Sequence, residues 1–135
     1  MSLRLLPLLV LLFSTKLYAY EFPLDVNEYI DDVKVVAYIN NSDIKPELSW
    51  QPFAGVPPLS MAAALQAIQE YASKADLEDL TLTGIELKPI PQYENQWHYL
   101  VKVKSEVDEV LESYYYIVLM DGKVISALKQ PDSIK

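Results

Sequence analysis

The stretch from Tyr114 to Met120 constrains the fold more than any other part of the chain. It reads YYYIVLM and contains no charged residue. Successive side chains of a β-strand point to opposite faces of a sheet, so this stretch carries apolar groups on both faces. We therefore expect a central strand here, with Tyr115 on the face opposite Tyr114 and Tyr116.

Four other segments have the composition of strands. The segment Gln96–Lys104 alternates clearly, with Trp97 and Val101 on one face and His98 and Lys102 on the other. This pattern is typical of a half-buried antiparallel strand. The other predicted strands are Val33–Asn40, Thr81–Pro89 and Lys123–Leu128.

The segments between and before these strands are more polar. The dipeptide Asp121-Gly122 predicts a tight turn into the last strand. The segment Ser105–Glu112 is acidic and is interpreted as a connector. The segment Tyr20–Asp32 is mixed and acidic, and we expect a helical turn near Asp25.

One strong helix is expected at Met61–Ala75. Ser60 is a favourable N-cap residue, and two prolines precede it closely. The segment has no Gly or Pro, and its apolar residues recur at helical spacing. The predicted apolar stripe contains Met61, Leu65, Ile68 and Ala72. Together these elements predict an α+β domain in which one main helix packs on a four- to five-stranded antiparallel sheet, whose other face is semi-polar.

Residues 1–19 have the pattern of a secretory signal peptide. Arg4 precedes an apolar run that ends at Phe13, and Ala19 offers a small residue for cleavage. The run is too short to span a bilayer, so we expect no membrane anchor after cleavage. Residues 20–135 then form a single domain. The chain has no Cys, which favours a bacterial protein that is periplasmic or secreted.

The charge balance excludes several classes of function. The chain has 19 Asp and Glu against 11 Lys and Arg, a formal net charge of -8, and Arg4 is its only arginine. Nucleic-acid binding is not expected, because the phosphate backbone requires many basic residues. Without Cys there is no thiolate nucleophile or thiolate metal site. The acidic clusters lack the spacing of a calcium loop, so we expect no catalytic, metal or cofactor site, although weak calcium binding stays open.

Aromatic residues crowd onto neighbouring predicted strands. Trp97, Tyr99 and Tyr115 combine an apolar body with a polar tip, which favours interfaces. The only histidine, His98, is interpreted as a surface residue in the middle of its strand. These four residues are our candidates for contacting a partner, and cross-strand packing in the core is the alternative.

Several of these segments match a known pattern. They are the helix entry Pro57–Ser60 with its helix, the strand Trp97–Val101 and the hairpin Tyr115–Val124, which together span about Leu59–Leu128. They resemble small secreted PepSY-like domains, within the wider cystatin-like α+β group. The resemblance implies a non-catalytic module and a role in restraining proteases. Inhibition of cysteine proteases is not implied, because the stretch most similar to the cystatin loop, Gln51–Gly55, precedes the helix.

The combined prediction is an exported, non-enzymatic binding module. We expect it to contact a peptide or protein through its sheet, either on the outer face or by addition of a strand at an exposed edge. The alternatives are a protease inhibitor or propeptide-like restraint, and a small-ligand carrier or enzyme that uses carboxylates and His98. A deep pocket that holds His98 beside two acids would favour the last of these.

Overall fold

The computed structural model of the chain describes residues 24–30 and 32–130. The predicted signal peptide, residues 1–19, lies outside the described residues. Strands make up 47% of the described part, and one α-helix accompanies them. The fold is therefore dominated by its sheet.

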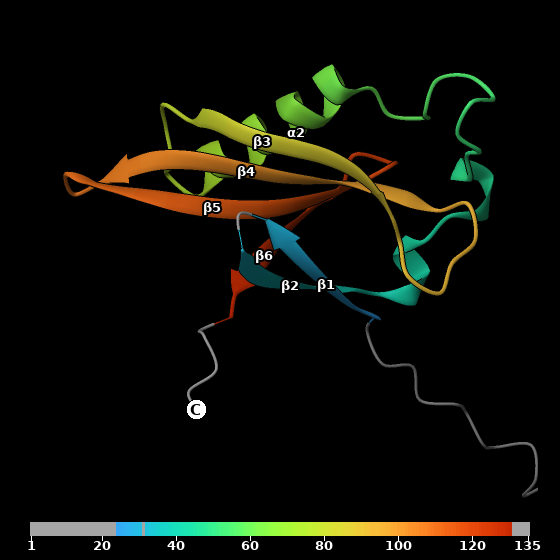
Figure 1. The fold of residues 1–135 in the computed structure, drawn as a ribbon. Helices are drawn as coiled ribbons and strands as arrows, with labels where there is room; N and C mark the ends of the chain where they lie inside the picture. Colours follow the sequence, from blue (N-terminus) through green and yellow to red (C-terminus); the bar gives the residue numbers. More distant parts are fainter. Residues whose placement is uncertain (1–23, 31, 131–135) are drawn as a thin grey trace, which may run out of the picture.

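The strands form one antiparallel sheet that curls into a half-barrel (Figure 1). Its strand order is β1-β2-β6-β5-β4-β3. The elements along the chain are β1 (Leu24–Ile30), β2 (Val33–Ile39), the short 3-10 turns η2 (Asn41–Asp43) and η3 (Pro46–Leu48), α2 (Met61–Lys74), β3 (Thr81–Pro89), β4 (Trp97–Val107), β5 (Val110–Leu119) and β6 (Val124–Lys129).

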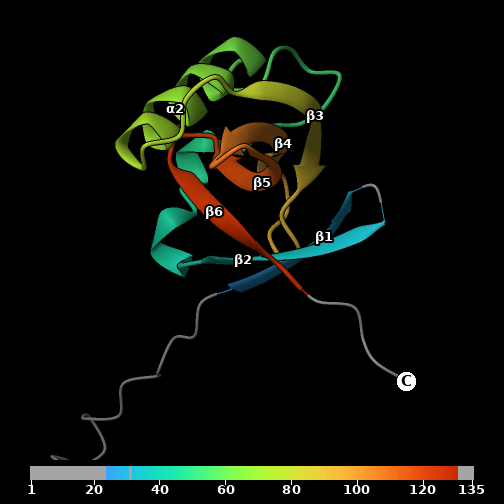
Figure 2. The same cartoon turned by 90° about the vertical axis from the view of Figure 1, so that its left-hand side faces the viewer.

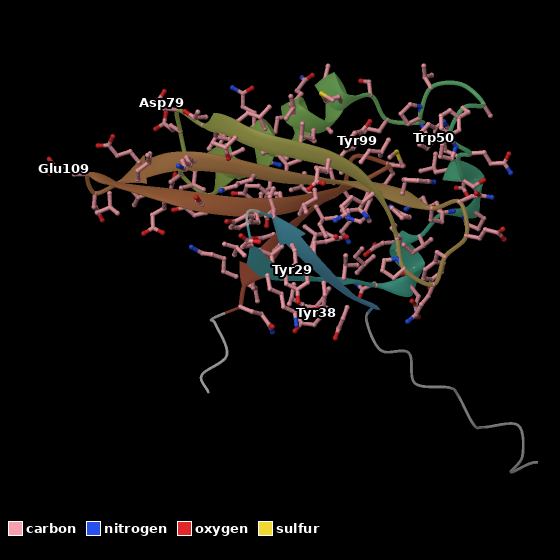
Figure 3. The ribbon with its side chains drawn as sticks, in the orientation of Figure 1. Tyr29, Tyr38, Trp50, Asp79, Tyr99 and Glu109 are labelled. Atoms are coloured by element: carbon pink, nitrogen blue, oxygen red, sulfur yellow. The ribbon has the colours of Figure 1, made fainter. Side chains whose placement is uncertain are left out.

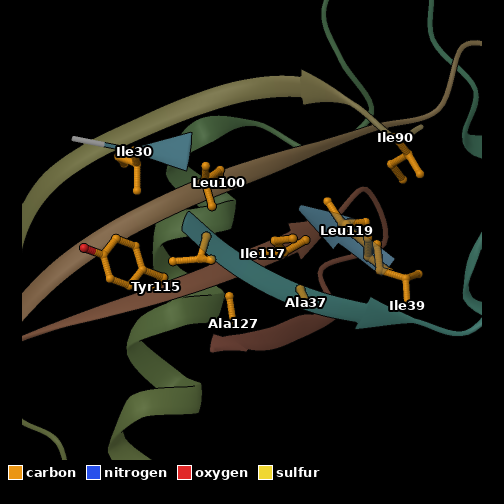
Figure 4. Close-up of a cluster of buried hydrophobic side chains, with 11 residues drawn as sticks. Ile30, Ala37, Ile39, Ile90, Leu100, Tyr115, Ile117, Leu119 and Ala127 are labelled. Atoms are coloured by element: carbon orange, nitrogen blue, oxygen red, sulfur yellow. The ribbon is translucent and has the colours of Figure 1, made fainter. Parts of the chain in front are cut away.

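The central strands β4 and β5 are covered on both faces. Figures 1 and 2 show α2 on one side of them and the β1–β2 hairpin on the other. The outer core lies under α2 and contains Ala64, Ile68, Tyr99, Val101, Val103, Tyr116, Val118 and Met120. The inner core lies under the hairpin (Figure 4) and contains Val26, Ile30, Val35, Ala37, Ile39, Ile90, Leu100, Tyr115, Ile117, Leu119 and Ala127.

The helix forms as its sequence predicts. The hydroxyl oxygen of Ser60 accepts a hydrogen bond from the Ala63 amide at 3.1 Å, which confirms Ser60 as the N-cap. The small residues Ala64 and Ala72 are fully buried beside Ile68, so the helix axis can approach the sheet closely. Within the predicted stripe, however, Met61 is half exposed.

The predicted four- to five-stranded sheet is wrong, because the sheet has six strands in a curled half-barrel. The segment expected to hold a helical turn near Asp25 is strand β1 instead. Its side chains alternate between buried Val26, Glu28 and Ile30 and exposed positions. The strand escaped sequence analysis because the charged Glu28 occupies an inward position in an otherwise apolar set.

The expected semi-polar sheet face is also wrong. The β1–β2 hairpin covers this face and buries Leu100 and Ile117 beneath it. The acidic connector predicted at Ser105–Glu112 is instead the end of a long β4–β5 hairpin, in which Ser105 pairs with Glu112. Its turn at Asp108 and Glu109 uses positive φ angles, so no glycine marks it in the sequence.

The inward face of β1 can be tested with Val26→Ala. We expect this variant to lower the free energy of unfolding by about 2 kcal/mol, because it removes buried methyl groups and leaves a cavity. Asn27→Ala changes the next, exposed residue on the same strand and should stay within about 0.5 kcal/mol. Urea unfolding followed by fluorescence measures both. Equal losses would contradict the inward orientation of Val26.

The cap of α2 can be tested with Ser60→Ala. Loss of the hydroxyl acceptor should lower the free energy of unfolding by about 1 kcal/mol. Ser73→Ala is the matched control, because this exposed serine lies inside the same helix, where alanine is the better helix former. Thermal unfolding followed by circular dichroism should show a lower midpoint for Ser60→Ala alone.

Candidate functional site

Two of the four predicted partner-binding residues hold the loop before α2 in place. The Trp97 indole donates a hydrogen bond to the Trp50 carbonyl at 3.0 Å, and the two rings pack edge to face at 5.4 Å. The Tyr99 hydroxyl donates to the Leu59 carbonyl at 2.6 Å. Burial raises the pKa of Tyr99, which keeps this donor protonated. Both side chains are therefore structural anchors of the loop.

The other two predicted residues lie inside the domain. Tyr115 belongs to the inner core, and the Lys102 ammonium lies 5.9 Å from the centre of its ring. His98 is fully buried, so the interpretation as a surface histidine is wrong. Its pairing partner on β5 is Leu119, and its side chain contacts Glu28 of the β1–β2 hairpin. The four residues do not form an exposed binding face.

His98 belongs to a buried ionic cluster that joins three strands. Glu28 on β1 lies between Lys88 on β3 and His98 on β4. The distance from Lys88 Nζ to Glu28 Oε1 is 2.6 Å, and that from His98 Nε2 to Glu28 Oε2 is 3.2 Å. The Glu28 side chain is only 8% exposed and that of Lys88 is 29% exposed. The cluster thus links the covering hairpin to the main sheet across the inner core.

The electrostatics of this cluster favour an ionised carboxylate. Burial alone would raise the pKa of Glu28, but contacts with His98 and Lys88 and the charges of these groups outweigh it and lower the pKa below 4.5. Neither ring nitrogen of His98 makes a well-aligned hydrogen bond. Nε2 nevertheless lies 3.2 Å from Glu28 Oε2, and this contact contributes to the lowered pKa of Glu28. His98 meets one carboxylate, not the two acids that would favour catalysis.

The two main surface hollows of the described residues lie away from this cluster. Neither of the two surface hollows described next is lined by His98, Glu28 or Lys88. Across residues 24–30 and 32–130, no three His, Asp or Glu side chains converge as a metal site would require. The arrangement suits the attachment of the hairpin better than chemistry on a ligand.

The two hollows lie between α2 and β3. The first hollow encloses about 500 Å³ and is lined by Leu65, Ile68, Gln69, Ser73, Leu77, Glu78, Asp79, Leu80, Leu82 and Val103. The second hollow encloses about 710 Å³ and is lined by Val56, Pro57, Pro58, Leu59, Ser60, Met61, Ala63, Ile85, Leu87 and Tyr99. Both use residues of α2 and β3, so we call them together the α2–β3 furrow.

The furrow follows from the width of the sheet. An α-helix is about 10 Å wide and strands lie about 4.8 Å apart, so one helix covers roughly two strands. The helix approaches β5 and β6 most closely, and β3 extends beyond it. The β3 side chains on the helix side, Leu82, Ile85 and Leu87, are therefore only partly covered.

The two ends of the furrow differ in chemistry. At the first hollow, where β3 begins, Glu78 and Asp79 add two carboxylates to a wall that also contains Gln69 and Ser73 beside its apolar residues. The second hollow has an apolar wall with exposed hydrophobic groups, because Val56 is 87% and Met61 52% exposed. Figure 3 shows Asp79 at the start of β3 and Tyr99 toward its other end.

Strand β3 also forms an edge of the sheet. It pairs with β4 on one side, and no described strand pairs with its other side. A register shift between Leu82 and Gly84 interrupts the ladder near the start of β3. The regular part, from Ile85 to Lys88, lies beside the second hollow. Unpaired backbone groups at such an edge can accept an additional strand.

Sequence reasoning found little of this furrow. Of its four candidate residues, only Tyr99 lines a hollow. The available signal was the run Val56–Met61 at the helix entry, which is largely apolar and contains two prolines and no charged residue. The partial covering of Ile85 and Leu87 depends on the position of α2 and could not be seen in the sequence.

Comparisons of the chain with models of protein families, with curated proteins and with solved structures found no match. No family is therefore assigned, and the functional inference depends on the geometry of the described residues. Within those residues, no helix has both the length and the apolar character of a membrane span.

The ionic cluster predicts a pH dependence of stability. The pKa of Glu28 is lower in the folded state than its ordinary value of 4.5. The ionised carboxylate therefore contributes fully to the free energy of unfolding above about pH 4.5, and this contribution is lost as the pH falls through the pKa of the folded state. We expect Glu28→Gln to lower the free energy of unfolding at neutral pH by about 1–3 kcal/mol, since the half-buried Lys88 ammonium then lacks its counter-charge. The difference from the unmodified chain should shrink in acid.

Urea unfolding at a series of pH values measures this difference. Glu86→Gln is the matched control, because it makes the same change at an exposed position on β3. A constant difference between Glu28→Gln and the unmodified chain across the acid range would contradict the role assigned to the Glu28 carboxylate.

Proposed function

We propose that this protein is an exported binding module that takes up an extended polypeptide segment of a partner along strand β3. The observation that carries the proposal is the coincidence of an unpaired sheet edge with the α2–β3 furrow. Backbone pairing at the edge would supply affinity, and the furrow would supply pockets for side chains.

The geometry favours an extended segment over a helix. Residues Ile85 to Lys88 provide a regular stretch of backbone with an open side, which is the template for strand addition. Alternate side chains of an added strand point to the same face, so one set would lie over the helix side of β3. That face holds Ile85 and Leu87, which are partly exposed, and the segment would remove their remaining surface from water.

The predicted signal peptide supports export, and the buried position of His98 supports binding rather than catalysis as the role of the domain. In this view Glu28, Lys88 and His98 hold the β1–β2 hairpin against the main sheet. Trp97 and Tyr99 hold the loop that forms one wall of the second hollow.

The proposal is tested by selecting peptides of random sequence, displayed on phage, against the purified chain. The best binder is then resynthesised with N-methyl groups on alternate backbone nitrogens, in the two possible phases. In an extended segment, alternate N–H groups point toward β3 and away from it. One phase should therefore weaken binding at least about tenfold, the loss of one or two backbone hydrogen bonds, and the other should leave it intact.

The location is tested by a matched pair of substitutions at neighbouring alanines of α2. Ala63→Phe should fill the second hollow and abolish binding of the selected peptide, whereas Ala62→Phe adds the same ring at an exposed position outside it. Circular dichroism establishes that both variants fold. Failure to select any peptide, or equal tolerance of both N-methyl phases, would overturn the proposed function.

A further inference from the structure

We infer that the segment bound in the α2–β3 furrow is cationic at one end, with a lysine or arginine beside Glu78 and Asp79 and apolar side chains at alternate positions before it. This inference rests on the proposed function and specifies the chemistry of the partner. It follows from the length of the furrow, its unequal ends and the charge of the chain.

The length of the furrow sets the length of the segment. The β3 residues that line the two hollows run from Leu82 to Leu87, and an extended chain rises about 3.3 Å per residue, so the lined part of β3 is about 17 Å long. A segment of similar length reaches from the second hollow to the first. Its side chains on the helix side would pass over Leu87, Ile85 and Leu82 in turn.

The second hollow selects an apolar side chain. Its wall contains no charged residue, and Val56, Met61 and Leu87 leave apolar surface open to water. A lysine or acidic residue placed there would lose hydration without gaining a counter-charge. An aliphatic or aromatic side chain would instead bury its own surface together with that of the wall.

The first hollow selects a cation. Glu78 and Asp79 line it, and neither hollow is lined by a lysine or arginine. The chain as a whole has a formal net charge of -8, so its long-range field also favours a basic partner. All strand pairs of this sheet are antiparallel. Antiparallel addition to β3 places the basic residue near the C-terminal end of the bound segment.

The test repeats the phage selection on the unmodified chain and on the double variant Glu78→Gln/Asp79→Asn. This variant removes both charges, keeps the side-chain shapes and retains a residue type that tolerates the positive φ of position 79. The unmodified chain should enrich peptides with lysine or arginine in the C-terminal part. The double variant should still enrich alternating apolar residues but lose the basic preference.

Glu106→Gln/Asp108→Asn is the matched control. It removes two carboxylates near the tip of the β4–β5 hairpin, which line neither hollow, and Asp108 also has a positive φ. For the peptide best enriched by the unmodified chain, the Glu78/Asp79 variant should weaken binding about three- to tenfold at low salt, and less at high salt. The control should change binding less than twofold.

The outcomes separate this inference from the proposed function. The inference would be overturned if the selected peptides showed no preference for lysine or arginine, or if both double variants selected peptides with the same preference. Either result would leave the proposed binding function standing. Failure to enrich any peptide would overturn both. A dimer of this chain that Ala63→Phe dissociates would assign the furrow to a second copy and would also overturn the inference.

Discussion

The structure depends on covering the β4–β5 pair from both sides. Leu100 and Ile117 face one way on these strands, and Val101 and Val118 face the other, and all four are fully buried. A sheet with two apolar faces is stable in water only when each face has its own cover. The helix α2 provides one cover, and the β1–β2 hairpin, folded over by the curl of the sheet, provides the other.

The two covers are attached in different ways. The helix is bound by its apolar face and by the Ser60 cap, which are local features of its sequence. The hairpin meets the rest of the ladder through a short pairing of β2 with β6, at Val35 and Val36. Its position therefore depends on side chains, namely the inner core and the contacts of Glu28 with Lys88 and His98. Glu28, a charged residue at an inward-facing position, therefore helps to attach the hairpin to the main sheet.

The α2–β3 furrow is a consequence of the same arrangement. The helix lies closest to β5 and β6, so the edge strand β3 keeps apolar side chains that the helix covers only in part. Under the proposal, the acidic residues Glu78 and Asp79 at one end of the furrow favour a basic residue in the partner. They also fix the direction in which the partner segment runs along β3.

Local sequence patterns determined the elements whose stability is local. The capped helix after Ser60, the presence of a strand at Trp97 and the turn at Asp121-Gly122 are all confirmed, although both faces of that strand are buried where the alternation predicted only one. Tertiary structure decided how many strands the sheet has, that His98 is buried, and where a partner could bind. These features depend on residues far apart in the chain, because burial at one strand is set by whichever element folds over it. An alternating pattern shows that a strand has two faces, but only the packed fold decides what covers each one.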